Sequence, residues 1–361
     1  MKSERDSDEN DDGKRNQSLL IKKRKAMKIN MTQWMEGIIR QRTVTAIPIM
    51  THPGIEMNGN TVREAVSDGK VHYDAVMTLM HRYPESAAAA TIMDLTTEAE
   101  AFGAEVTFSD IAVPAVSSRL LDSVEAIHAL QVPSLSTGRI PAYLKANLMA
   151  AKAIQDRPLL AGCIGPFSLA GRLYDMSEIM VLIYEHPDAA HTLLQKCTDF
   201  IEKYCQALKA TGANGVVMAE PAAGLMSNDD CLTFSSEYVK RIVDHLQDDT
   251  FSIVLHNCGN TGHCTQAMVY TGAAAYHFGN KCVMSEVLKD VPSTALAMGN
   301  IDPVSVFKDG TPEKMRTAVL ELLESTKDYP NFVLSSGCDT PPHTPPENID
   351  AFFEALKEWN R

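Results

Sequence analysis

The chain has 361 residues, of which 45% are hydrophobic and 22% are charged, as in a globular protein with a substantial core. Its formal net charge of −13 argues against nucleic-acid binding, because a phosphate-binding surface requires clustered Lys and Arg. No apolar run reaches the ~18 residues of a membrane helix, and eight cysteines without a recognisable secretory signal lead us to expect a cytoplasmic protein with reduced or metal-bound thiols.

Residues 1–30 differ in composition from the rest of the chain. An acidic run at 6–12 is followed by a basic cluster at 22–25. Such a stretch cannot bury enough apolar surface to offset the entropy of ordering it. We therefore expect residues 1–30 to be a disordered charged tail and residues 31–361 to form the folded domain.

Eight short apolar runs recur along the domain, each of a length typical of a buried parallel strand. They lie at 46–50, 88–94, 158–164, 215–220, 252–256, 274–278, 295–299 and 332–336. The segments between them have helical patterns. Strand and helix alternating eight times predict a single-domain α/β fold, a closed (β/α)8 TIM barrel.

Several helix ends can be predicted from local signals. Thr61 and Glu64 have the spacing of a capping box. The apolar 3–4 pattern over 188–209 stops at Gly212, and Thr311 precedes a helix that runs to about Lys327. A last helix is expected over 349–359.

Polar residues stand at the carboxyl ends of the predicted strands, where barrel enzymes form their active sites. They are Asp94, Glu220, His256, Asn257, Cys258, His277, Asn280 and Cys338. We expect these side chains to gather at one end of the barrel, its mouth. For His277 we expect a ring satisfied by a backbone carbonyl.

Three of these residues have the chemistry of a metal site. His256 and Cys258 are two positions apart at a strand end, so their side chains can point to the same side. Cys338 arrives from the eighth strand, and the donor set of one imidazole and two thiolates suits Zn²⁺ with one open position. The cysteines lie far apart in the sequence, which favours a catalytic over a structural zinc. The alternative is three core residues that happen to end strands.

Thiolate ligands make zinc a poor Lewis acid for hydrolysis, but such a zinc can hold an incoming thiol as a nucleophilic thiolate. The predicted reaction is alkyl transfer to sulfur. Asp94 and Glu220 are the predicted catalytic carboxylates, which would position the acceptor or take its proton. Three roles stay open for Glu220, namely a fourth zinc ligand, a substrate contact or a helix cap. Asn257 and Asn280 are predicted to orient the bound substrate or cofactor.

The sequence resembles the uroporphyrinogen decarboxylase superfamily over roughly residues 31–361. The resemblance rests on His256-x-Cys258 with the distant Cys338, on Gly-Asn-Ile-Asp-Pro at 299–303, and on Asp94 followed by Glu-Ala-Glu-Ala-Phe-Gly-Ala at 98–104. Within the superfamily it is most similar to the methylcobamide:coenzyme M methyltransferase branch. The triad is typical of that branch, and the 299–303 stretch only of the superfamily.

This resemblance implies a (β/α)8 barrel with zinc at its mouth, held by His256, Cys258 and Cys338. It also implies a methyl group delivered from a methylated corrinoid (methylcobamide) on a separate protein, in methanogenesis or one-carbon metabolism. No corrinoid-binding Asp-x-His-x-x-Gly motif occurs in the chain, so a corrinoid protein is the expected partner. Asp94 matches the catalytic aspartate of the decarboxylases, and its role here is open.

Two other functions are compatible with the resemblance. A uroporphyrinogen decarboxylase would clamp its substrate's carboxylates with arginines after the first strand, but residues 50–54 are Met-Thr-His-Pro-Gly and the next arginine is Arg63. The other alternative is a corrinoid- or thiol-binding protein without turnover. For the methyltransferase, the acceptor is a small molecule such as coenzyme M, another thiol or tetrahydrofolate, and the sequence does not specify which.

Overall fold

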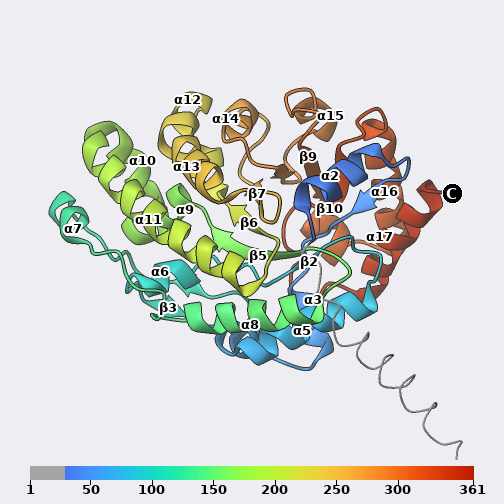
Figure 1. Ribbon diagram of the computed structural model, residues 1–361, viewed down its shortest axis with the longest axis horizontal. Coiled ribbons are helices and arrows are strands. Elements are labelled where there is room, and N and C mark those ends of the chain that lie inside the picture. Colours follow the sequence, from blue (N-terminus) through green and yellow to red (C-terminus); the bar gives the residue numbers. More distant parts are fainter. Residues whose placement is uncertain (1–28) are drawn as a thin grey trace, which may run out of the picture.

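The computed structural model describes residues 29–361, and its centre is one sheet of eight parallel strands (Figure 1). The strands are β1 Thr45–Ala46, β2 Ala89–Ala90, β5 Leu159–Ile164, β6 Gly215–Ala219, β7 Ser252–Asn257, β8 Ala275–Phe278, β9 Leu296–Ile301 and β10 Phe332–Ser336. Their order is β1-β10-β9-β8-β7-β6-β5-β2. The two edge strands meet where the amide of Ala87 donates to the carbonyl of Ala46 at 3.0 Å. The predicted (β/α)8 barrel is confirmed, and each predicted run overlaps one strand.

Strands β1 and β2 are shorter than predicted because side chains take over their backbone hydrogen bonds. The amide of Ile49 donates to the hydroxyl of Ser336 at 3.0 Å instead of continuing the ladder with β10. The amide of Ile92 donates to Nε2 of His72 at 2.9 Å. Both segments therefore leave the sheet early, after β1 and after β2.

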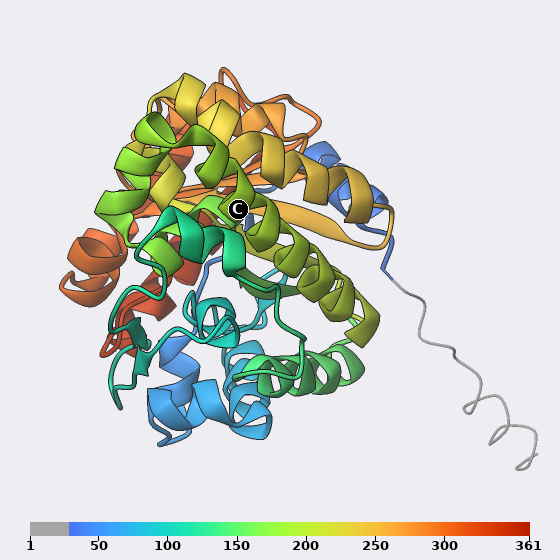
Figure 2. The ribbon, with the colours of Figure 1, turned by 90° about the vertical axis from the view of Figure 1, so that its left-hand side faces the viewer.

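Helices surround the barrel on all sides (Figures 1 and 2). The α-helices are α2 Met31–Arg40, α3 His52–Met57, α4 Val62–Ser67, α5 Gly69–Arg82, α6 Thr97–Ala101, α7 Val124–Ala129, α8 Ile140–Ala153, α9 Pro166–Tyr174, α10 Met176–Glu185, α11 Pro187–Thr211, α12 Asn228–Cys231, α13 Glu237–Leu246, α14 Thr265–Tyr270, α15 Met284–Val287, α16 Pro312–Thr326 and α17 Pro346–Trp359. A 3₁₀ turn, η1 Pro221–Leu225, and two π-helical turns, η2 Leu232–Ser236 and η3 Pro303–Lys308, complete the loops above the strands. An antiparallel pair, β3 Val106–Thr107 and β4 Ala115–Val116, was not predicted.

The helix signals in the sequence are confirmed. Thr61 and Glu64 form the capping box of α4, with each side chain bonded to the other residue's amide. Gly212 ends α11 in the left-handed conformation, at φ 102°, which glycine adopts without the strain of a side chain. Thr311 caps α16. The last helix starts at Pro346, three residues before the predicted position.

Helix α2 closes the amino-terminal end of the barrel. Met31, Met35 and Ile38 pack against the inward side chains of the strands, among them Val254 and Val333. The amide of Met31 donates to the carbonyl of Asp249, just before β7. With this end filled by apolar side chains, the mouth at the carboxyl ends of the strands is left for chemistry.

The folded part begins slightly earlier than the predicted boundary. Asn30 caps α2 through a hydrogen bond from the amide of Gln33 at 2.9 Å. The predicted disordered tail, residues 1–30, otherwise falls on residues outside the described range. Among the helices of residues 29–361, none is both long and apolar enough to cross a membrane.

Candidate metal centre

The predicted metal ligands meet at the barrel mouth. His256 lies near the end of β7, Cys258 follows that strand directly, and Cys338 lies two residues beyond β10. One ligand atom of each lies within 4.8 Å of the others, and the Sγ of Cys338 is 3.7 Å from the Nε2 of His256. Strands β8 and β9 separate β7 from β10 in the sheet, so the ligands converge from two sides of the mouth. Within residues 29–361 no other group of His, Cys, Asp and Glu side chains has this arrangement.

A second histidine fixes the orientation of the first. His256 and His277 are register partners on β7 and β8, and their Nδ1 atoms are 2.7 Å apart. The Nε2 of His277 lies 2.9 Å from the hydroxyl of Ser335, which donates its own proton to the carbonyl of Ile47 at 2.7 Å. His256, His277 and Ser335 lie two residues after Val254, Ala275 and Val333 in their strands. Their side chains therefore point into the barrel, as those of the three earlier residues do.

The direction of these hydrogen bonds follows from the carbonyl at their end. A carbonyl only accepts, so the Ser335 hydroxyl donates to it and accepts a proton from Nε2 of His277. The Nδ1 of His277 then accepts from Nδ1–H of His256, which leaves a lone pair on Nε2 of His256. Burial and the neighbouring His256 hold the pKa of His277 well below its ordinary value, so its ring stays neutral. His256 is thereby fixed in the tautomer that a metal requires.

The two cysteine thiols lie close enough to shift each other's pKa. The hydrogen bond with Cys338 lowers the pKa of the Cys258 thiol to about 7. The same contact, together with burial, raises the pKa of Cys338. One thiolate is therefore favoured near neutral pH even before a cation binds, and a divalent cation would favour ionisation of both.

A glycine allows the β8 loop to approach this centre. A Cβ atom on Gly279 would come within 2.7 Å of the Cα of Cys258 and 3.0 Å of its Cβ. Any side chain there would push the loop that carries Cys258 out of place. A glycine at position 279, directly after β8, therefore lets this loop pack against Cys258.

Asp94 lies four residues beyond β2 and is fully engaged by its neighbours. Its Oδ1 accepts from the amide and hydroxyl of Thr96, at 2.9 and 2.7 Å. Its Oδ2 accepts from the guanidinium of Arg139 and from the hydroxyl of Tyr143. Arg139 also binds Glu100, with Nε 2.6 Å from Oε2. In this arrangement Asp94 anchors Arg139 and Tyr143, and each of its oxygens already accepts two hydrogen bonds.

Glu220 follows β6 and caps a helix from another part of the chain. Its two oxygens accept the amides of Phe167 and Ser168 in the first turn of α9, both at 2.8 Å, and the hydroxyls of Ser168 and Ser235. Burial raises its pKa, and these donors partly offset that rise. A Cβ on Gly165 would lie 2.1 Å from Cγ of Glu220, so only glycine allows this approach. Of the three roles considered for Glu220, the geometry matches the helix cap, although the helix is α9 and not the one that follows it.

The two asparagines are also held by the protein itself. Asn257 is buried, and its Oδ1 accepts the amides of Gly259 and Asn260, which shapes the loop after Cys258. Asn280 is exposed and donates from Nδ2 to Asp302 at 2.8 Å. Asn257 lies between His256 and Cys258 in the sequence and Asn280 follows β8, and the side chains of both support loops of the mouth.

The role of His277 and the presence of Ser335 in the site were missed from the sequence. His277 was expected to bond a backbone carbonyl, whereas its side-chain partners are His256 and Ser335, and Ser335 was not singled out at all. Both occupy the inward phase of their strands, next to the same barrel interior as His256. Register between strands is the signal that would have found them, and one sequence does not provide it.

Comparison with known proteins agrees with this architecture. The family model described as Uroporphyrinogen decarboxylase (URO-D) matches residues 38–359. The chain belongs to the uroporphyrinogen decarboxylase family. The expected family is therefore confirmed, and the match spans almost all of the described barrel.

Within this family, the relatives include both activities considered from the sequence. The chain is 30% identical over 270 residues to the methylcobamide:CoM methyltransferase MtbA of Methanosarcina mazei, covering 74% of this chain and 78% of the relative. It is 27% identical over 278 residues to a uroporphyrinogen decarboxylase of Legionella pneumophila, covering 75% of this chain and 78% of the relative. These similarities support a methyltransferase-type member of the uroporphyrinogen decarboxylase family.

Solved structures show the same fold. A methyltransferase from Methanosarcina mazei superposes with a TM-score of 0.82 at 22% identity, covering 92% of this chain and all of that one. A B12-independent methionine synthase from Shewanella sp. W3-18-1, solved in complex with selenomethionine, gives a TM-score of 0.56 at 14% identity, covering 87% of this chain and 94% of that one. At these identities the likeness concerns the barrel alone.

Proposed function

We propose that this member of the uroporphyrinogen decarboxylase family is a zinc-dependent methyltransferase. It would move a methyl group from a methylated corrinoid, carried by a partner protein, to a thiol such as coenzyme M. The observation that carries the proposal is the convergence of one imidazole nitrogen and two cysteine sulfurs within 4.8 Å at the barrel mouth. The similarity to a relative named methylcobamide:CoM methyltransferase supports the same chemistry.

The donor set fits zinc in chemistry as well as in position. His256, Cys258 and Cys338 would hold the ion, and three protein ligands leave one position for an acceptor. His256 presents Nε2 with its lone pair because His277 accepts the proton on Nδ1. When bound, zinc would lower the pKa of a coordinated thiol and keep it nucleophilic near neutral pH. The chain's part is to orient these donors and to receive the acceptor's proton.

Two features of the site count against decarboxylation of a tetrapyrrole. Asp94, which matches the catalytic aspartate of the decarboxylases, has no exposed side-chain surface and is bound to Arg139. The first strand leads into His52 and α3 with no arginine before Arg63. Arg139, the cation beside Asp94, is already paired with two carboxylates. Arg139 is therefore not free to bind the carboxylates of such a substrate.

Metal analysis and a transfer assay test the proposal together. We expect about one zinc per chain in the purified protein and transfer of a methyl group from methylcobalamin to coenzyme M. Cys258→Ala should lose both. Transfer to tetrahydrofolate in place of coenzyme M would keep the zinc centre and change the acceptor. Absence of metal from both proteins, with turnover of uroporphyrinogen, would establish the decarboxylase; tight binding of methylcobalamin without transfer would establish a binding protein.

The hydrogen bond from His256 to His277 should control zinc affinity. His277→Phe fills the same space but cannot accept the proton of Nδ1, so His256 loses the partner that fixes its tautomer. We expect zinc affinity to fall roughly 10–100-fold, as for other lost supporting contacts of metal ligands. Competition with a chromophoric chelator measures this. Ser335→Ala removes only the next hydroxyl and should cost less; equal affinity in the wild type and His277→Phe would contradict the assignment.

A further inference from the structure

A short turn lies between the two loops that carry the cysteine ligands. It comprises residues 279–282, directly after β8. On one side, a Cβ atom on Gly279 would lie 2.7 Å from the Cα of Cys258. On the other side, a Cβ atom on Gly337, which precedes the second cysteine ligand, would lie 2.7 Å from the amide nitrogen of Asn280. The turn therefore packs against both cysteine loops.

Hydrogen bonds hold this turn in place. The amide of Cys282 donates to the carbonyl of Gly279 at 3.1 Å and closes the turn. The side chain of Asn300, in β9, donates to the carbonyls of Gly279 and Cys282 at 2.9 and 2.8 Å. The thiol of Cys282 donates to the carbonyl of Asn260 at 3.0 Å. The backbone of the turn is therefore fixed relative to β9 and to the loop after Cys258.

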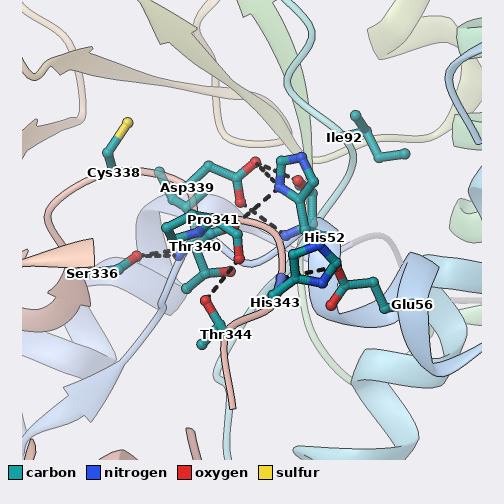
Figure 3. A network of polar contacts seen from close by, with 12 residues as sticks. His52, Glu56, Ile92, Ser336, Cys338, Asp339, Thr340, Pro341, His343 and Thr344 are labelled. Carbon is teal, nitrogen blue, oxygen red and sulfur yellow. Dashed lines mark hydrogen bonds and ion pairs between the residues drawn. The ribbon is translucent and has the colours of Figure 1, made fainter. Parts of the chain in front are cut away.

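The loop that carries Cys338 is anchored from the opposite direction by α3. Nδ1 of His52 lies 3.1 Å from the carbonyl oxygen of Thr340 and 3.7 Å from Oδ2 of Asp339. Figure 3 shows these contacts, with the sulfur of Cys338 directed away from the His52 ring. The loop of Cys338 is thus held between α3 and the turn at 279–282.

The cation of this turn is Lys281. Its side chain is exposed, and within residues 29–361 the ion pairs of lysine are formed by other lysines. Asp302, which the same turn contacts, accepts the side chain of Asn280 and the amides of Val304 and Ser305. The amine of Lys281 is therefore available to an anion from solution.

The charge of Lys281 acts on the metal centre. The pKa of the Cys258 thiol is lowered to about 7, first by the hydrogen bond with Cys338 and also by the positive charge of Lys281. With an acceptor thiolate bound, three sulfur anions would exceed the charge of Zn²⁺. An anionic group elsewhere on the acceptor would add to this excess, and a neighbouring ammonium group would offset it.

We propose that Lys281 binds an anionic group of the methyl acceptor, a sulfonate or a carboxylate, and so selects anionic thiols over neutral ones. This inference rests on the thiol acceptor of the proposed function and names the class of thiol. The ammonium group donates a charge-assisted hydrogen bond to the anionic oxygen while the sulfur of the acceptor binds at the metal centre. A neutral thiol of the same length lacks this contact.

The test compares coenzyme M with 2-mercaptoethanol, in which a hydroxyl replaces the sulfonate. Calorimetry on the zinc-loaded wild type should show tighter binding of coenzyme M. Lys281→Met should weaken that binding roughly 10-fold, as for the loss of one hydrogen bond to a charged group, with zinc content and 2-mercaptoethanol binding unchanged. In the transfer assay the same variant should raise KM for coenzyme M and leave kcat nearly unchanged.

Two further variants serve as controls. Lys281→Arg keeps the charge and should keep the preference for coenzyme M. Lys289→Met removes an exposed lysine of the same β8–β9 connection, which pairs with Glu286, and should bind both thiols as the wild type does.

Three results would contradict the proposal in different ways. Equal binding of coenzyme M by the wild type and Lys281→Met would overturn the role of Lys281 while leaving the methyltransferase standing. Equal weakening of both thiols would do the same, because Lys281 would then act on the metal centre and not on the anionic group. Failure of the zinc-loaded wild type to bind either thiol would instead overturn the thiol acceptor, and the role of Lys281 with it.

Discussion

Replacing Cys338 with alanine should abolish zinc binding and methyl transfer together while leaving the barrel folded. Its sulfur closes the ligand group from the β10 side, 3.7 Å from Nε2 of His256. Without it, His256 and Cys258 offer two ligands, one fewer than catalytic zinc sites use. Zinc affinity should therefore fall by more than the roughly 10–100-fold expected for a lost supporting contact. Metal content, transfer rate and melting temperature measure the three parts of this prediction.

A matched control is a cysteine outside the ligand group. Cys197 is fully buried on α11, and Cys197→Ala should retain both zinc and transfer despite a small cavity. Cys338 is only partly buried, so its loss should cost little packing. Retention of full transfer by Cys338→Ala would defeat the zinc assignment.

The fold and the metal ligands could be predicted because both follow from short-range patterns. Buried parallel strands form continuous apolar runs, and each run marked a strand of the barrel. The spacing of His256 and Cys258 places both on one side of a strand end, and the barrel brings Cys338 to the same mouth. These steps need only strand periodicity and the rule that strand ends meet at one edge.

The roles of the other strand-end residues could not be predicted because their partners are distant in sequence. Asp94 is bound by Arg139, from the start of α8, and Glu220 is bound by Ser168 in α9. From the sequence alone, a carboxylate near a strand end is expected to be free to bind substrate or metal. The structure shows that these donors already bind it. His52 illustrates the converse, since its Nδ1 contacts Asp339 and Thr340 from the other end of the chain, and its Nε2 has no hydrogen-bond partner among the described residues. The sequence identifies chemical groups at the mouth, whereas only the packing shows which of them have unused bonding capacity.

The ion pair between Asp94 and Arg139 should contribute strongly to the free energy of unfolding. Arg139→Met preserves much of the side-chain volume but leaves the carboxylate of Asp94, which has no exposed surface, without its cation. Removing one partner of a buried pair costs about 3–5 kcal/mol, because the remaining charge stays desolvated. Urea denaturation should show this loss as a lower midpoint. Arg316→Met, which breaks an exposed pair with Glu358, should have a much smaller effect.

A double variant distinguishes a structural role of Asp94 from a catalytic one. With Asp94→Asn added to Arg139→Met, the fully buried unpaired charge is removed and only the partly exposed Glu100 lacks its partner, so most of the lost stability should return. Asp94→Asn alone should retain zinc and methyl transfer, because Asp94 contacts Arg139, Thr96 and Tyr143 and none of the metal ligands. If instead Arg139→Met were as stable as Arg316→Met, and Asp94→Asn abolished turnover, Asp94 would be a catalytic group as in the decarboxylases. A buried aspartate can serve as an anchor or as a catalyst, and the stability cycle and the turnover assay give opposite results for the two.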